Sequence, residues 1–248
     1  MRFIHYITCF RMAKPGDAPR CHPPYTDTMS STDKKIPQGV SAEAAKLLER
    51  AYALESDEQS RALYRDWAET YDQTMLDGLN YLSPATVADL LARHMPDRQG
   101  AVLDVGCGTG LAGQNLAGHG FTVIDGLDYS PEMMRVAARR GVYRHFIEAD
   151  LHARLAIPSG SYDGALGSGI FTHGHVDARS LDELFRVLKP GAPFVFTVKL
   201  EVFESLGFKD KLAAFTLAGR IREVFFTHDR HYSTSAQPDG VFCVYAAV

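Results

Sequence analysis

The sequence has little cysteine and no long apolar run. Its 248 residues include four cysteines, Cys9, Cys21, Cys107 and Cys243. None of these forms a C-x-x-C pair or a Cys/His cluster with zinc-ligand spacing, so they indicate free thiols in a reducing compartment and no metal site. No apolar run approaches the ~18 residues that a membrane-spanning helix needs. We therefore expect a soluble, cytoplasmic protein without a membrane partner.

The chain also has no excess of positive charge. Lys and Arg number 26 against 30 Asp and Glu, which gives a formal net charge of −4. A protein that coats nucleic acid or an anionic membrane needs a basic surface, so this balance argues against both roles. Hydrophobic residues make up 46% of the chain, enough to build a core for one domain with a modest appendage.

The first 40 residues lack the pattern of a folded segment. Residues 13–40 are rich in Pro, Ser, Thr and Asp, a composition typical of disorder. Residues 2–12 are partly apolar, but no signal-peptide cleavage site follows, and Met29 opens a stretch that resembles an ordinary cytosolic start. We expect residues 1–40 to be a disordered or artefactual extension.

Residues 41–97 are predicted to be helical. Helices are expected near 41–54, over 59–77 and from Pro84 to Met95, with Ser83 as the N-cap of the last. The middle helix carries an aromatic stripe at helical spacing, Tyr64, Trp67 and Tyr71. Such a stripe packs into a core or forms a cover over a site, and the sequence leaves both open.

From residue 98 onward, strands alternate with helices. Strands are expected at 101–106, 121–128, 143–150, 162–169 and 193–200, and helices at about 110–118, 131–140 and 179–189. This order predicts a parallel sheet covered on both faces. The last two strands, 223–232 and 240–248, have no helix between them and should be antiparallel. The predicted fold class is therefore α/β, a Rossmann-like doubly wound sheet that is mostly parallel with an antiparallel C-terminal hairpin.

The segment Leu103–Gly110 (LDVGCGTG) lies where the first strand turns into a helix. Three alternate glycines let the backbone adopt positive φ and approach a ligand closely. The helix N-terminus beyond them offers free N–H groups, and Asp104 adds a carboxylate to the same crevice. A ligand with both a carboxylate and an ammonium group matches this mixture, as the amino-acid part of S-adenosylmethionine (SAM) does.

A second interpretation of the same turn exists. Gly108, Gly110 and Gly113 match the dinucleotide fingerprint G-x-G-x-x-G, and Asp128 follows at a distance that suits a ribose. In that frame Asp104 would face a pyrophosphate and Gly106 would have no role. An NAD-linked oxidoreductase on a related fold therefore remains as an alternative.

Four ordered motifs carry a resemblance to class I SAM-dependent methyltransferases. LDVGCGTG is similar to the first motif of that family, and GLDYSPEM, EADL and YDGALGSGIFTH resemble the next three, over about residues 60–248. The segments YRDWAETYDQTM and LNYLSPATVADLL resemble the small-molecule Williams–Beuren-region methyltransferase-like group. The family has an antiparallel last strand, which agrees with the predicted hairpin.

The resemblance implies roles for individual residues. Asp128 would bind the ribose, Asp150 would meet the adenine amino group, and the 168–175 loop would border the transferred methyl. The expected cofactor-binding residues are Trp67, Tyr71, Asp104, Gly106, Cys107, Gly108, Gly110, Leu111, Asp128, Tyr129, Met133, Asp150, Leu151 and Ser168. Cys107 has no activating base nearby in sequence, so we expect a small side chain that fits the turn, not a nucleophile.

Two histidines, His173 and His175, follow the fourth predicted strand, and one of them could act as general base. The alternative, which the sequence favours, is that they are loop histidines that face solvent or bond to the backbone. His228 and His231 could approach the pocket from the other side, but nothing in the sequence argues for it.

The expected activity is transfer of a methyl group to a small-molecule acceptor by in-line displacement. The family's nucleic-acid amino methylases carry an N-P-P-Y type motif where this chain has Gly167-Ser168-Gly169-Ile170, which argues against a nucleic-acid substrate. A non-catalytic SAM-binding partner subunit is the other alternative. We expect a monomer or a weak homodimer.

Overall fold

The structure is a computed structural model that describes residues 46–47, 50–51, 57–172 and 176–248. The predicted extension, residues 1–40, lies outside the described residues, as does most of the first expected helix. Within the described ranges, no helix is both long enough and apolar enough to cross a bilayer.

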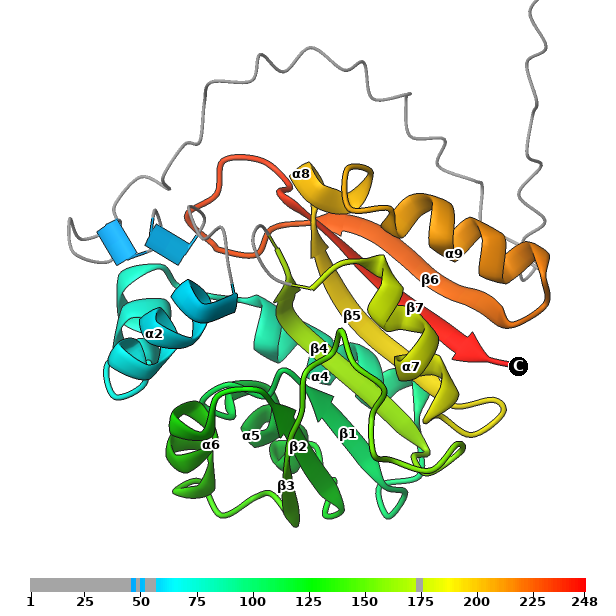
Figure 1. Ribbon diagram of the computed structural model, residues 1–248, viewed down its shortest axis with the longest axis horizontal. Helices are drawn as coiled ribbons and strands as arrows, with labels where there is room; N and C mark the ends of the chain where they lie inside the picture. Colours follow the sequence, from blue (N-terminus) through cyan, green and yellow to red (C-terminus); the bar gives the residue numbers. More distant parts are fainter. Residues whose placement is uncertain (1–45, 48–49, 52–56, 173–175) are drawn as a thin grey trace, which may run out of the picture. The chain divides into compact units, whose positions relative to one another are not determined.

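The described chain forms a seven-stranded sheet with the order β3-β2-β1-β4-β5-β7-β6 (Figure 1). Strands β1 to β5 are parallel to one another, whereas β7 runs antiparallel between β5 and β6. The predicted fold class is therefore confirmed. The strands are β1 (Val102–Val105), β2 (Ile124–Asp128), β3 (His145–Glu148), β4 (Gly164–Phe171), β5 (Pro193–Lys199), β6 (Ile221–Asp229) and β7 (Gly240–Ala247).

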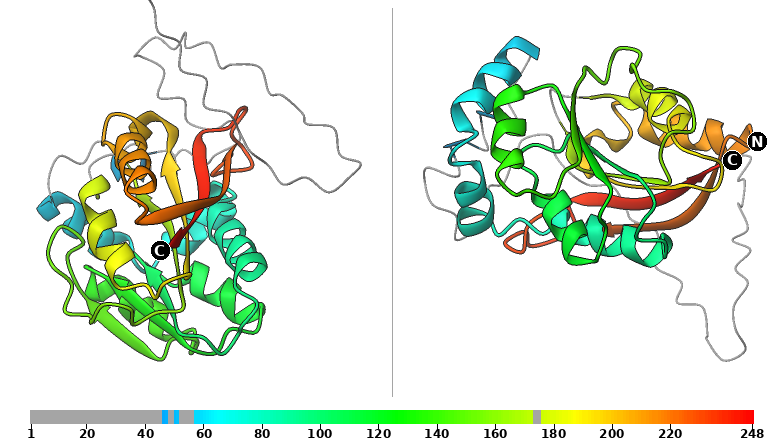
Figure 2. Two further views of the ribbon diagram at one scale, coloured as in Figure 1. Left: turned by 90° about the vertical axis from the view of Figure 1, so that its right-hand side faces the viewer. Right: turned by 90° about the horizontal axis from the view of Figure 1, so that it is seen from below.

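Helices cover both faces of the sheet (Figure 2). On one face lie α4 (Ser83–His94) and α5 (Leu111–Gly118), and on the other α7 (Leu181–Arg186) and α9 (Phe208–Leu217). Side chains of β1 alternate between the two cores: Val102 packs with α4 and α5, and Leu103 packs with α7. The remaining elements of this region are α6 (Pro131–Ala138), the 3₁₀ turn η2 (Ala178–Ser180) and α8 (Leu200–Phe203).

The helix expected over 59–77 is broken into three pieces. These are α2 (Asp57–Trp67), α3 (Tyr71–Gln73) and the π-helical η1 (Thr74–Gly78). The amide of Thr70 bonds to the carbonyl of Trp67 at 3.0 Å, and this three-residue turn ends α2. The predicted aromatic stripe still forms, because the rings of Trp67 and Tyr71 pack edge to face with centroids 4.8 Å apart. We call residues 57–78 the cover; its helix α2 lies beside α6 (Figure 1).

Two further local predictions differ from the structure. Ser83 is the first residue of α4 and not its N-cap, because the cap position belongs to Leu82, whose amide bonds to the carbonyl of His231. The helix expected over 179–189 is split into η2 and the shorter α7. Helix α9 was not predicted, although the spacing of its buried residues, Phe208, Leu212 and Phe215, is helical.

Candidate functional site

A cavity lies at the carboxyl ends of β1, β2, β3 and β4, where an open α/β sheet binds ligands. It has an empty volume of about 890 Å³ with its open mouth included, which suits a ligand of cofactor size. Its walls are Arg61, Tyr64, Tyr71, Gly106, Gly108, Leu127, Asp128, Tyr129, Met133, Ala149, Asp150, Leu151, His152, Ser168, Gly169, Ile170 and Val176.

Two glycines shape the turn that follows β1. Gly106 has φ +62°, and a Cβ atom there would lie 1.9 Å from Cγ2 of Ile170. Gly108 has φ +52°, but a Cβ atom there would meet nothing within 4 Å. Gly106 is therefore required by close packing, whereas Gly108 leaves its backbone open to the cavity. Both glycines line the cavity wall. Gly106, which is not part of the dinucleotide fingerprint, therefore has a structural role in this turn.

Asp128 ends β2 and is buried, with 7% of its surface exposed. One carboxylate oxygen accepts the amide of Gly108 at 2.8 Å, and the other accepts the amide of Ser130 at 2.9 Å. Burial raises the pKa of this carboxyl, while the amides oppose the shift. The two amides fix its position beside the glycine turn, and the remaining lone pairs can accept hydroxyl donors from the cavity. Ser130 caps α6, as predicted, by accepting the amide of Met133.

Asp104 is placed behind the turn instead of in the crevice. It is 1% exposed, is absent from the cavity wall and accepts the hydroxyl of Tyr143 at 2.6 Å. Burial raises its pKa to about 7, which the bond from Tyr143 opposes. A Cβ atom at Gly113 would lie 2.2 Å from that same hydroxyl, so this glycine makes room for the Asp104–Tyr143 pair. Asp104 was expected to face the ligand, but its side chain is buried behind the turn and bonds to Tyr143 instead.

The expected site residues divide into three groups. On the cavity wall lie Tyr71, Gly106, Gly108, Asp128, Tyr129, Met133, Asp150, Leu151 and Ser168. Behind the wall lie Trp67, Asp104, Cys107, Gly110 and Leu111, all of them buried. His173 and His175 lie outside the described residues. Burial raises the pKa of the Cys107 thiol well above its usual value, which disfavours a thiolate nucleophile.

Sequence reasoning did not assign Arg61, Tyr64, His152 or Val176 to the site. Arg61 stacks over the ring of Tyr129, with its guanidinium carbon 5.5 Å from the centroid. The sequence pattern could have identified Arg61 and Tyr64, because they precede Trp67 at three-residue spacing and so share its face of the helix. His152 and Val176 lie in loops whose path the sequence does not fix.

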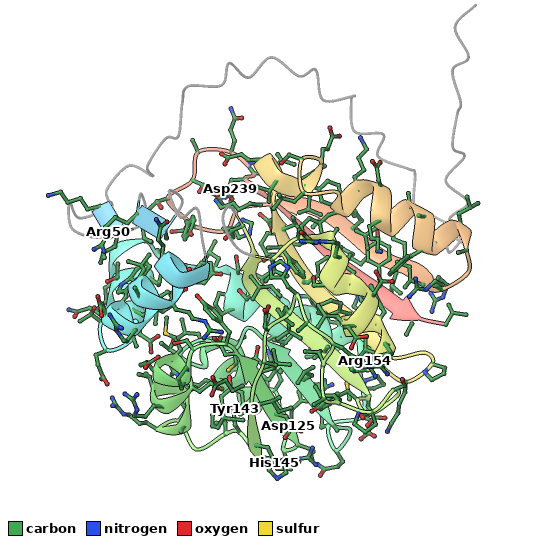
Figure 3. The ribbon with its side chains drawn as sticks, in the orientation of Figure 1. Arg50, Asp125, Tyr143, His145, Arg154 and Asp239 are labelled. Atoms are coloured by element: carbon green, nitrogen blue, oxygen red, sulfur yellow. The ribbon has the colours of Figure 1, made fainter. Side chains whose placement is uncertain are left out.

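A polar network lies near the far end of the cavity. The hydroxyls of Tyr81 and Ser168 are 3.0 Å apart, and burial raises the pKa of Tyr81. Next to Tyr81 the ring of Tyr232 packs at 5.3 Å. His231 is 2% exposed and lies 3.3 Å from Asp239, away from the cavity wall. Figure 3 shows Asp239 at the upper end of the sheet, opposite to the end that carries Asp125 and His145.

Comparison with known proteins agrees with this geometry. Residues 102–191 match a family described as "Methyltransferase domain". The human methyltransferase-like protein 27 is 33% identical over 159 residues, which is 63% of this chain and 64% of that protein. Residues 102–191 contain the turn after β1 and the strands β1 to β4 that border the cavity. This segment of the chain is therefore similar to methyltransferase domains.

Other relatives resemble the methyltransferase domain over shorter spans or in fold alone. The 18S rRNA (guanine-N(7))-methyltransferase RID2 of Arabidopsis thaliana is 35% identical over 108 residues, 39% of this chain and 37% of that protein. The crystal structure of the [4+2]-cyclase SpnF superposes with a TM-score of 0.60 and 16% identity, over 78% of this chain and 97% of that one. The chain thus spans less than two thirds of either named sequence relative.

The segment that matches the methyltransferase family presents residues that fit SAM. The buried Asp128 faces the cavity with acceptor atoms only, which suits a ribose diol. The open space at Gly108 lets a ligand approach the backbone of the turn. In the part of the chain that the structure describes, no three His, Cys, Asp or Glu side chains gather as metal ligands.

Proposed function

We propose that this protein transfers the methyl group of SAM to a small-molecule acceptor. The observation that carries the proposal is the hydrogen bond between Asp128 and the amide of Gly108. It places a buried carboxylate beside a glycine whose Cβ position has no atom within 4 Å, so a ligand can approach the backbone there. When bound, SAM supplies a methyl group already activated by its positively charged sulfur. The main task left to the protein is alignment, which can contribute on the order of 7–11 kcal/mol toward a barrier.

Each wall of the cavity has a role in this proposal. Asp128 accepts the ribose hydroxyls, and Asp150 with Leu151 holds the adenine. The backbone of Gly106 and Gly108 receives the amino-acid end. Tyr71, on the cover, shields the reacting centre from water. A general base at His173 or His175 stays a prediction, as do the cytoplasmic location and a monomeric or weakly dimeric state.

The acceptor side favours a small, uncharged substrate. On the cover and β4 the wall consists of Tyr64, Tyr71, Ser168, Gly169 and Ile170, which carry no charge, and of Arg61, whose guanidinium stacks over Tyr129. A wall of this kind suits an apolar or planar molecule, whereas an RNA substrate needs basic side chains for its phosphates. RID2 is named as an rRNA methyltransferase, so an RNA acceptor is the competitor that the assay must include.

The first test is isothermal titration of the full chain with SAM, its demethylated product and NAD(H). We expect SAM and product to bind and NAD(H) not to bind. Replacement of Asp128 by Ala removes hydrogen bonds to a charged group, each worth about 1.5–3 kcal/mol, so SAM affinity should fall at least about tenfold. The exposed Asp210→Asn in α9 is the matched control and should leave affinity unchanged.

Two outcomes would redirect the proposal. Binding of NAD(H) alone, or wild-type SAM affinity in Asp128→Ala, would contradict the SAM site. SAM binding with no methyl transfer to small molecules or to RNA, measured with methyl-labelled SAM, would instead favour a non-catalytic partner subunit.

A further inference from the structure

One carboxylate of the cover reaches the glycine turn directly. Asp72 in α3 accepts a hydrogen bond from the hydroxyl of Thr109 and forms an ion pair with Arg140. Thr109 is 1% exposed and stands between Gly108 and Gly110 in the chain. The neighbour of Asp72, Tyr71, lines the cavity. Asp72 thus joins the two walls that lie on either side of the proposed SAM site.

Arg140 closes this arrangement into a ring of three residues. Its Nε donates to the carbonyl oxygen of Thr109 at 2.6 Å, while its terminal nitrogen binds Asp72. Only 15% of the Arg140 side chain is exposed. A Cβ atom at Gly110 would lie 3.0 Å from Cδ of Arg140, so the glycine there gives the side chain its path. Three elements therefore meet: the cover, the turn after β1 and the segment after α6.

We propose that Asp72 is a positioning residue that couples docking of the cover to the conformation of the SAM-binding turn. This inference rests on the proposed function of the cavity. Held by Thr109 and Arg140, Asp72 keeps Tyr71 over the cavity and keeps the turn in its ligand-ready shape. We call the contacts of Asp72 with Thr109 and Arg140 the latch. Without the latch the cover detaches from the turn, so bound SAM dissociates faster.

A neighbouring ion pair provides the matched control. Glu69, three residues before Asp72, binds Arg139 through two contacts of 2.7 Å. It also ties the cover to the end of α6, but the two side chains are 60% and 58% exposed and contact no part of the turn. Solvent screens a pair so exposed, so it contributes little to stability. If ion pairing to the cover were all that mattered, the two pairs would behave alike.

The test compares Asp72→Asn with Glu69→Gln in the full chain. SAM affinity and dissociation rate are measured by titration and stopped flow. We expect Asp72→Asn to weaken SAM binding by about 5- to 10-fold, mainly through faster dissociation, and Glu69→Gln to change it by less than about twofold. In a double-mutant cycle, Arg140→Gln should add little once Asp72 is neutral.

Trp67 gives a second readout that needs no ligand. It is the single tryptophan of the chain, is 3% exposed and packs against Tyr71. We expect its emission to shift to the red in ligand-free Asp72→Asn and to stay unchanged in Glu69→Gln, while far-UV circular dichroism shows that both variants are folded.

Equal effects of the two variants, or wild-type emission and SAM kinetics in Asp72→Asn, would overturn the latch. If the wild-type chain binds no SAM, the proposed function fails, yet the Trp67 emission of Asp72→Asn still decides whether Asp72 docks the cover.

Discussion

Two buried aspartates at the ends of neighbouring strands have different partners and therefore different chemistry. Asp128 is held by two backbone amides and faces the cavity. Asp104 is held by the hydroxyl of Tyr143 and has no open side toward the cavity. Both pKa values are raised by burial, and that of Asp104 reaches about 7. The carboxylate beneath the turn thus changes its charge near neutral pH.

This shift predicts a pH dependence of stability. The folded protein holds a proton on Asp104 up to about pH 7, whereas the unfolded chain loses it near pH 4. The stabilisation is therefore complete below about pH 4 and is lost as the pH rises to about 7. In Asp104→Asn, the free energy of unfolding should lack this fall, which is up to about 1.4 kcal/mol per pH unit. Urea denaturation at pH 5, 6, 7 and 8 measures the slopes.

Asp125→Asn is the control for that experiment. Although burial opposes it, hydrogen bonds from Arg144 and Tyr162 lower the pKa of Asp125 below its usual value. The contribution of Asp125 is therefore present above about pH 4 and lost below it, outside the measured window. Parallel slopes for wild type and Asp104→Asn would mean that Asp104 is already ionised in the folded protein at pH 5.

At the scale of an element, two glycines of the turn after β1 have different roles: Gly106 allows close packing, and Gly108 leaves room for a ligand. In Gly106→Ala, positive φ and overlap with Ile170 should together reduce the free energy of unfolding by about 2–4 kcal/mol. Gly108→Ala meets only the backbone strain, about 1–2 kcal/mol, because its methyl group enters open space. That space is the cavity, so Gly108→Ala should weaken SAM binding about tenfold in titration.

Gly118→Ala serves as the reference for these glycine variants. Gly118 ends α5, is exposed and has nothing within 4 Å of its Cβ position. Alanine there should raise the free energy of unfolding by up to about 1 kcal/mol without affecting SAM. A Gly108→Ala variant that bound SAM like Gly118→Ala would place the ligand elsewhere than over the turn.

The sequence predicted elements well where one local pattern governed them. The glycine turn, the Ser130 cap and the alternation of strands with helices are all short-range signals, and each is present in the structure. The broken cover was not predicted, because helical spacing alone is the same on both sides of the turn at residues 68–70. The position of Asp104 was missed for a related reason: its partner, Tyr143, is 39 residues away.

At the scale of the whole molecule, the segment before α4 and the loop between β6 and β7 are held together. The amide of Leu82 donates to the carbonyl of His231 at 2.8 Å, and Tyr81 pairs with Tyr232 in an isolated bridge. Asp239 anchors this loop, accepting the amide of His231 and the ammonium of Lys199 at 2.7 Å each. Contacts between residues so distant in sequence have no local signature, which is why no role could be given to His231.

Asp239 should therefore contribute more to stability than an ordinary surface carboxylate. Its Lys199 partner has 9% of its side chain exposed, so replacement by Asn removes a neutralising charge from a largely buried cation. We expect Asp239→Asn to lower the free energy of unfolding by about 2–3 kcal/mol in urea denaturation. Glu204→Gln breaks an ion pair with Lys209 whose side chains are 72% and 59% exposed, and should leave the free energy of unfolding nearly unchanged because solvent screens the pair. Similar small losses in both variants would show that solvent screens the Lys199–Asp239 pair, and that apolar packing around Tyr81 and Tyr232 holds the loop instead.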